Sequence, residues 1–158
     1  MNRLGSFLAL SAIVVAGAFA GTAAQASANV NVAFKIHNAD PSASMIRSGA
    51  PDTGITGLIS PAASVLAGGD DPASGSASFS LPAPTLGNDV HASVSYANAS
   101  NGLDNLCTFT IKVSHTGPVS YTVHFSADQH STNCSVPSDV TNSTGQFTST
   151  TYALNWSR

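Results

Sequence analysis

The residues best suited to bind a metal ion lie in one short stretch, His124-Phe125-Ser126-Ala127-Asp128-Gln129-His130. Imidazole and carboxylate groups are the ligands that zinc and similar ions prefer. On an extended chain Asp128 and His130 share one face, and His115 could join them across a hairpin. The spacing matches no established metal signature, however, and histidines on a polar strand face are commonly only solvated. The candidate ligands are therefore His115, His124, Asp128 and His130, but we predict no bound metal and no other cofactor.

The chain carries no motif that is specific to an enzyme: both G-x-S-x-G and S-x-x-K are missing. It has no Glu, so the paired carboxylates of a glycosidase would both have to be Asp. The adjacent pair Asp70-Asp71 lies in a Gly/Pro-rich stretch typical of a turn, with calcium binding as an alternative. Because a Ser-His-Asp arrangement is recognised by geometry, a hydrolase stays an alternative. It would need one of these histidines beside Asp128 or Asp139 in a cleft.

Polar and apolar residues alternate with a period of two over most of the chain, which is the pattern of strands with one buried face. Outside the first 26 residues no window has a convincing helical period. Between two of these segments, the Gly117-Pro118 pair marks a turn joining antiparallel strands. The clearest strand segments are 30–36, 90–96, 107–113 and 119–125, with weaker ones at 76–81 and 146–156.

Such strands need a second sheet to cover their apolar side. Seven or eight short strands predict an all-β, antiparallel β-sandwich, immunoglobulin-like or jelly-roll in broad terms, with a small β-barrel as the alternative. We expect residues 27–158 to form a single domain. Residues 38–75 are rich in Pro, Gly and Ser, and there we expect long loops with one or two short edge strands, at 44–48 and 55–60.

The first 26 residues have the pattern of a secretory signal peptide. Arg3 supplies the positive start, residues 4–20 are an apolar run, and Ala24-Gln25-Ala26 is a small-x-small cleavage pattern. We predict cleavage between Ala26 and Ser27 and a secreted or periplasmic product. An uncleaved anchor is the alternative, although the apolar run is short for a span and no later run approaches one.

Cys107 and Cys134 are the only cysteines, and in an oxidising compartment we expect them to form one structural disulfide. A redox or metal-binding pair would have a closer spacing. A hairpin turn centred at residues 116–117 places Cys107 opposite Ser126. The bridge would then tie the loop 127–138 to the base of the hairpin.

Charge excludes one class of partner. Only 8% of residues are charged and the formal net charge is −3. Without the leader, the chain has four basic residues and eight Asp. The basic residues form no cluster in the sequence that could displace counterions from nucleic acid. Those four residues are Lys35, Arg47, Lys112 and Arg158.

Three aromatic residues could contact a partner: Tyr96, Tyr152 and Trp156. Because Tyr152, Leu154 and Trp156 share one face of the last predicted strand, we favour core packing for them instead.

An early alternating strand, a Pro/Ser/Gly loop, the run Ser74-Gly75-Ser76-Ala77-Ser78-Phe79-Ser80-Leu81 and then paired strands follow one another along the chain. This order resembles secreted aegerolysin-like and actinoporin-like sandwiches. Those proteins bind membranes with aromatic-rich loops, so the resemblance implies a membrane-active protein. The single Trp and the few basic residues depart from their pattern, and we assign no family.

Taken together, these features predict a secreted binding or surface-interaction domain rather than an enzyme. Its partner could be a protein, a glycan or a membrane surface. The two alternatives are a membrane-active sandwich and a small secreted hydrolase that uses Asp and His.

Overall fold

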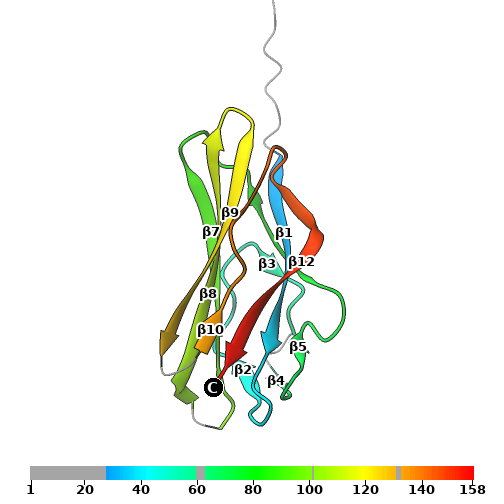
Figure 1. Ribbon diagram of the computed structural model, residues 1–158, viewed down its shortest axis with the longest axis vertical. Coiled ribbons are helices and arrows are strands. Elements are labelled where there is room, and N and C mark those ends of the chain that lie inside the picture. Colours follow the sequence, from blue (N-terminus) through cyan, green and yellow to red (C-terminus); the bar gives the residue numbers. More distant parts are fainter. Residues whose placement is uncertain (1–27, 60–62, 101, 131–132) are drawn as a thin grey trace, which may run out of the picture.

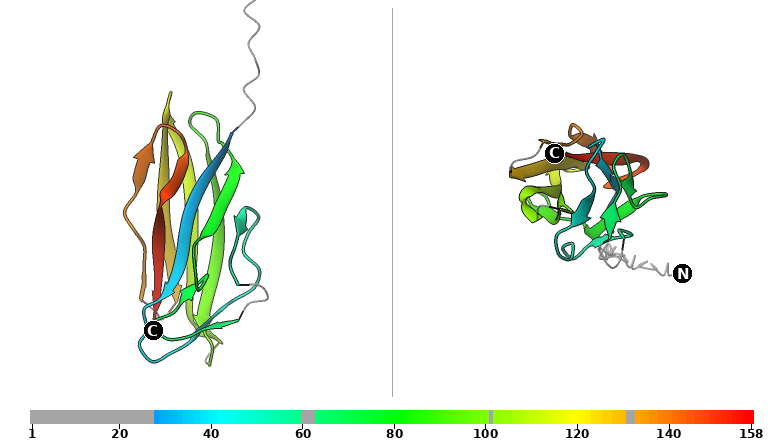
Figure 2. Two further views of the ribbon diagram at one scale, coloured as in Figure 1. Left: turned by 90° about the vertical axis from the view of Figure 1, so that its right-hand side faces the viewer. Right: turned by 90° about the horizontal axis from the view of Figure 1, so that it is seen from below.

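The computed structural model describes residues 28–59, 63–100, 102–130 and 133–158. They form two β-sheets packed face to face in an elongated sandwich, and no helix is present among them (Figures 1 and 2). The predicted all-β sandwich is confirmed. The barrel alternative is wrong, because no pairing between the described strands joins the two sheets. The predicted signal peptide and its cleavage site between Ala26 and Ser27 lie outside the described residues.

Sheet A has the strand order β10–β12–β1–β6–β3, and β5 pairs with β1 beyond the end of β6. One pair departs from the antiparallel prediction, since the first strand, β1, runs parallel to the last, β12. The strands are β1 (Asn29–Asn38), β3 (Ile55–Thr56), β5 (Asp70–Asp71), β6 (Ala77–Pro82), β10 (Asn133–Ser135) and β12 (Gln146–Ser157).

Sheet B is antiparallel, with the order β11–β9–β8–β7–β2–β4. Its middle is the long hairpin of β8 and β9, whose register differs from the sequence prediction: Cys107 lies opposite Gln129, not Ser126. The turn is centred further along, at Pro118 and Val119. The strands are β2 (Met45–Arg47), β4 (Ser64–Val65), β7 (Asp89–Asn98), β8 (Gly102–Gly117), β9 (Ser120–His130) and β11 (Val140–Asn142).

The Pro/Gly/Ser-rich segment 38–75 is more ordered than expected. Its described residues contain strands at both predicted places, β2 within 44–48 and β3 within 55–60, and two further strands, β4 and β5. Each is two or three residues long, and two belong to each sheet. The described residues form twelve strands against the seven or eight predicted, and β10 and β11, outside this segment, are also additional. Gly54 shows how closely the segment packs: its φ is +99°, and a Cβ there would stand 2.8 Å from the Leu81 side chain. Only glycine meets both conditions without strain.

The core fills the space between the sheets, because most inward residues of the long strands are apolar. Trp156 and Leu154 are fully buried, so core packing of the last strand is confirmed, and Tyr96 is buried as well. Tyr152 is only partly buried, with its ring tilted against Phe125 at a centroid distance of 5.0 Å. Two of the three candidate surface aromatics therefore belong to the core.

The predicted disulfide between Cys107 and Cys134 is present, with a Cα–Cα distance of 6.0 Å. Its position corrects the expectation that it ties a loop to the hairpin base. Residues 127–130 continue β9, and Cys134 belongs to β10, which pairs with β12 in sheet A. Since Cys107 lies on β8, the bridge joins sheet B to sheet A.

A buried hydrogen bond also connects the sheets. The Tyr96 hydroxyl on β7 donates to Asp71 Oδ2 on β5 at 2.6 Å, and the Ile59 N–H donates to Asp71 Oδ1 at 2.8 Å. Burial, the hydrogen bond to Asp71 and the charge of Asp71 all raise the pKa of Tyr96. The hydroxyl is therefore held in its protonated, donating form.

In the described part of the chain, no helix has the length and apolar character needed to cross a bilayer.

Candidate functional site

The outer face of sheet B carries a group of polar side chains that the strand register brings together. Alternation along β7, β8 and β9 turns His91, Lys112 and His124 outward while their neighbours enter the core. Lys112 lies directly opposite His91 on one side and His124 on the other. Directly opposite residues in a sheet have Cβ atoms about 5 Å apart, so these three basic groups form one row.

Two carboxylates flank this row. The Lys112 ammonium lies 4.0 Å from Asp89 Oδ2, and His91 Nδ1 lies 3.9 Å from Asp89 Oδ1. At the other end His124 Nδ1 is hydrogen-bonded to Asp139 Oδ2 at 2.6 Å. The five side chains are between 35% and 63% exposed, so each keeps hydrogen-bonding capacity toward solvent or a ligand.

Hydroxyl groups continue the polar surface along the same strands. Ser114 lies opposite Asp89 on one side and Thr122 on the other. Thr122 Oγ1 is 2.8 Å from Thr141 Oγ1 on β11 and 3.4 Å from Thr116 Oγ1. We call the whole surface the polar patch; its members are Asn88, Asp89, His91, Lys112, Ser114, Thr116, Thr122, His124, Asp139 and Thr141.

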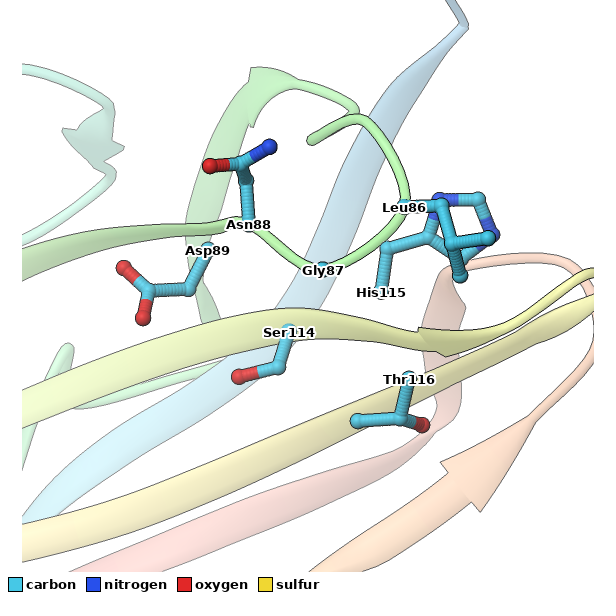
Figure 3. Close-up of a pocket in the computed structure, with 7 residues that line it drawn as sticks. All are labelled: Leu86, Gly87, Asn88, Asp89, Ser114, His115 and Thr116. Carbon is cyan, nitrogen blue, oxygen red and sulfur yellow. The ribbon is translucent and has the colours of Figure 1, made fainter.

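A shallow open depression of about 410 Å³ adjoins the patch at the end of the sandwich where β7 begins (Figure 3). Its lining includes Asn88, Asp89 and Ser114 from the patch and Leu86 from the preceding loop. The loop is fixed to β8, since the Gly87 N–H donates to the His115 carbonyl at 2.9 Å and the His115 N–H donates to the Asn88 carbonyl at 3.0 Å. The depression thus has a backbone held in place by hydrogen bonds.

His115 lines the depression but is not part of the polar patch. Its ring stacks on Tyr121 with a centroid distance of 4.4 Å, and its Nδ1 is 3.1 Å from the Pro84 carbonyl oxygen. In Figure 3 the imidazole lies beside Leu86, on the other side of the strand from Ser114. His115 therefore packs against the loop that precedes β7 and does not face His124.

The predicted metal candidates do not come together. Asp128 lies four residues from His124, a distance of about 13 Å along a strand, and His130 lies further still along β9. Nowhere in residues 28–59, 63–100, 102–130 and 133–158 do three or more His, Cys, Asp or Glu side chains form a group that could hold a metal ion. Of the four candidates, only His124 belongs to the patch.

One His–Asp contact that a hydrolase would need does form, between His124 and Asp139. It lies at the edge of sheet B, where both side chains are at least about a third exposed. Within the described residues no hydroxyl group hydrogen-bonds to His124. The pair thus matches the His–Asp part of a Ser-His-Asp catalytic triad, but within the described residues no serine or threonine hydroxyl is aligned with it.

Asp70 and Asp71, the adjacent carboxylates, face opposite sides of β5. Asp71 points into the core toward Tyr96, whereas Asp70 accepts hydrogen bonds from Lys35 Nζ at 2.8 Å and His37 Nδ1 at 2.7 Å. Partial burial raises the pKa of Asp70, but these two partners outweigh it and hold the pKa below its usual value. Because the two carboxylates diverge, they cannot hold one calcium ion between them.

Sequence alternation already placed His91, Lys112 and His124 on outward positions, but it did not bring them together. With the turn centred at residues 116–117, Lys112 would face the wrong residue of β9. Centring it on Pro118 would have found the row, since proline favours the second position of a β-turn. Asp89 has no sequence signal of its own beyond its place at the start of a strand.

Comparisons of the chain with protein-family models, with curated proteins and with solved structures gave no significant match.

Proposed function

We propose that the protein is an exported, non-enzymatic binding module that holds its ligand on the polar patch and the adjoining depression. The observation that carries this proposal is the row formed by Lys112 between His91 and His124, with Asp89 and Asp139 at its ends. It gathers five of the 17 Asp, His, Lys and Arg side chains of residues 27–158 on one exposed face.

The rigidity of the face supports binding. Ser93 and Thr110 share a hydrogen bond of 2.8 Å, as do Ser95 and Thr108, so neighbouring strands are linked by side chains as well as backbone. A sheet holds its side chains at fixed spacing, so little conformational entropy is lost when a ligand binds across it.

The openness of the site favours binding over catalysis. Catalytic groups gain strength where water is excluded, whereas the His124–Asp139 pair is exposed at a sheet edge. The membrane-active alternative draws less support, because Tyr96 and Trp156 are buried and cannot serve as aromatic membrane contacts.

Export is supported by the leader pattern at residues 1–26 and by the disulfide, which is compatible with an oxidising compartment.

The experiment is a panel of immobilised polysaccharides, extracellular proteins and lipid vesicles, probed with the wild type and two matched variants. His91→Glu places a new carboxylate in the patch, and Ser78→Glu places one at an exposed position of β6, in sheet A. We expect binding that His91→Glu abolishes and Ser78→Glu leaves intact. Equal effects of the two variants, or hydrolysis of an ester, amide or glycoside that His124→Gln abolishes, would contradict the proposal.

A further inference from the structure

We infer that the ligand of the polar patch is a neutral polysaccharide, held by hydrogen bonds across the strands of sheet B, with one sugar ring seated in the depression beside Leu86. This inference deepens the proposed function and rests on it.

Charge is the first argument. The patch contains one lysine and no arginine, and each of its carboxylates already has a basic neighbour: Lys112 and His91 for Asp89, and His124 for Asp139. A polyanion needs several unpaired cations along its path, and the chain as a whole carries a net charge of −3. A patch whose charges compensate one another suits an uncharged ligand.

The lack of anchoring side chains is the second argument. Energetic centres of protein interfaces are rich in Trp, Tyr and Arg that become fully desolvated, and no patch member is of these types. Peripheral membrane binding needs an apolar face or a basic cluster. Among the described residues, the exposed large hydrophobic side chains are Leu66, Leu86 and Val119, and of these three Leu86 lines the depression.

The chemistry of the patch is the third argument. Amide, hydroxyl, imidazole, ammonium and carboxylate groups together offer both donors and acceptors, which is what the vicinal hydroxyls of a sugar require. A sugar ring also has an apolar face of C–H groups. In the depression Leu86 offers an apolar surface, 58% exposed, and it shares the lining with Asn88, Asp89 and Ser114. In Figure 3 its side chain lies beside the His115 imidazole.

The extent of the patch favours a polymer over a single sugar. The hydroxyl line from Ser114 through Thr122 to Thr141, extended by Asp89, crosses four strands of sheet B. At about 4.8 Å between strands, it spans roughly 14 Å. Several sugar units can therefore contact the face at once, and their weak individual contacts add.

Affinity electrophoresis of the mature protein tests the inference, in gels that contain dextran, laminarin, xyloglucan or galactomannan. Hyaluronan, dextran sulfate and anionic phosphatidylserine vesicles serve as the competing classes. Asp89→Ala and Lys112→Met each remove a charged hydrogen-bonding group from the patch. Asp128→Ala is the matched control, since it removes an exposed carboxylate from the same sheet outside the patch.

We expect at least one neutral polysaccharide to retard the protein. Asp89→Ala and Lys112→Met should each weaken the retardation about tenfold, the effect of one charge-assisted hydrogen bond, and Asp128→Ala should not. Retardation by polyanions or vesicles alone, retardation insensitive to the patch variants, or no retardation by any neutral polymer would overturn the inference. If a protein or a vesicle then bound the wild type and His91→Glu abolished that binding, the inference of a neutral polysaccharide would fail but the proposed function would stand.

Discussion

Removing a single hydroxyl group tests how the two sheets are held together. In Tyr96→Phe the aromatic ring keeps its place in the core, while the hydroxyl and its hydrogen bond of 2.6 Å to Asp71 Oδ2 are lost. Both residues are at most 1% exposed, so no water can replace the missing donor without repacking. Among the described residues, the carboxylate would keep the Ile59 N–H as its side-chain hydrogen-bond donor, and this N–H is bound to the other oxygen.

The expected cost follows from this geometry. A hydrogen bond to a charged group contributes about 1.5–3 kcal/mol, and an unsatisfied buried acceptor costs a similar amount. We therefore expect Tyr96→Phe to lower the free energy of unfolding by about 2–3 kcal/mol. For a domain of this size the melting temperature should fall by about 3–5 °C for each kcal/mol.

Urea unfolding followed by the fluorescence of Trp156 measures the loss, since this is the only tryptophan and it is fully buried. Tyr152→Phe is the matched control: the same atom is removed from a partly exposed tyrosine, and we expect a change below about 0.5 kcal/mol. The double variant Tyr96→Phe/Asp71→Asn should cost less than the sum of the two single variants.

A loss below about 0.5 kcal/mol in Tyr96→Phe, or additive effects in the double-mutant cycle, would refute the reasoning. Either result would mean that the hydroxyl and the carboxylate do not depend on each other for burial.

Three further predictions concern stability. Replacing both Cys107 and Cys134 by Ala should cost about 3–4 kcal/mol in urea unfolding, because the bridge closes a sequence separation of 27; equal stability of oxidised and reduced protein would contradict the link between sheets. Because the pKa of Asp70 is lowered in the fold, its ion pairs stabilise the protein above about pH 4 and this contribution is lost as the pH falls through the folded-state pKa. Asp70→Asn should thus destabilise at pH 6 but progressively less below pH 4, and a pH-independent cost would argue against this assignment. Gly145→Ala should cost about 1–3 kcal/mol in thermal unfolding, since φ is +70° and the new Cβ would lie 2.8 Å from Val30 Cγ1; an unchanged melting temperature would be incompatible with that contact.

Much of the fold can be predicted from local sequence patterns. Period-two alternation located β1, β6, β7, β8, β9 and β12, and their one-sided apolar faces implied a second sheet. Local sequence patterns do not predict short strands whose pairing partners are distant in the chain. The segment 38–75 lacks alternation, and its brief strands form by pairing with distant parts of the chain. β2, β3 and β5 pair with β7, β6 and β1, and β4 pairs with β2.

The candidate site shows the same division. Which side chains point outward was predictable from alternation, but which of them meet depended on the hairpin register. The register predicted from the sequence differs from the observed one by three residues and would keep Lys112 apart from His124. In the observed register the two residues lie directly opposite each other.

The sequence by itself determined the all-β character, the presence of one cysteine pair and the burial of Trp156, because each follows from residue type and local spacing. Only the tertiary structure decided that the disulfide spans the two sheets, that β1 lies parallel to β12, and that Tyr96 meets Asp71. These contacts join residues distant in the chain. They are selected by the combined packing of both sheets, which no local pattern specifies.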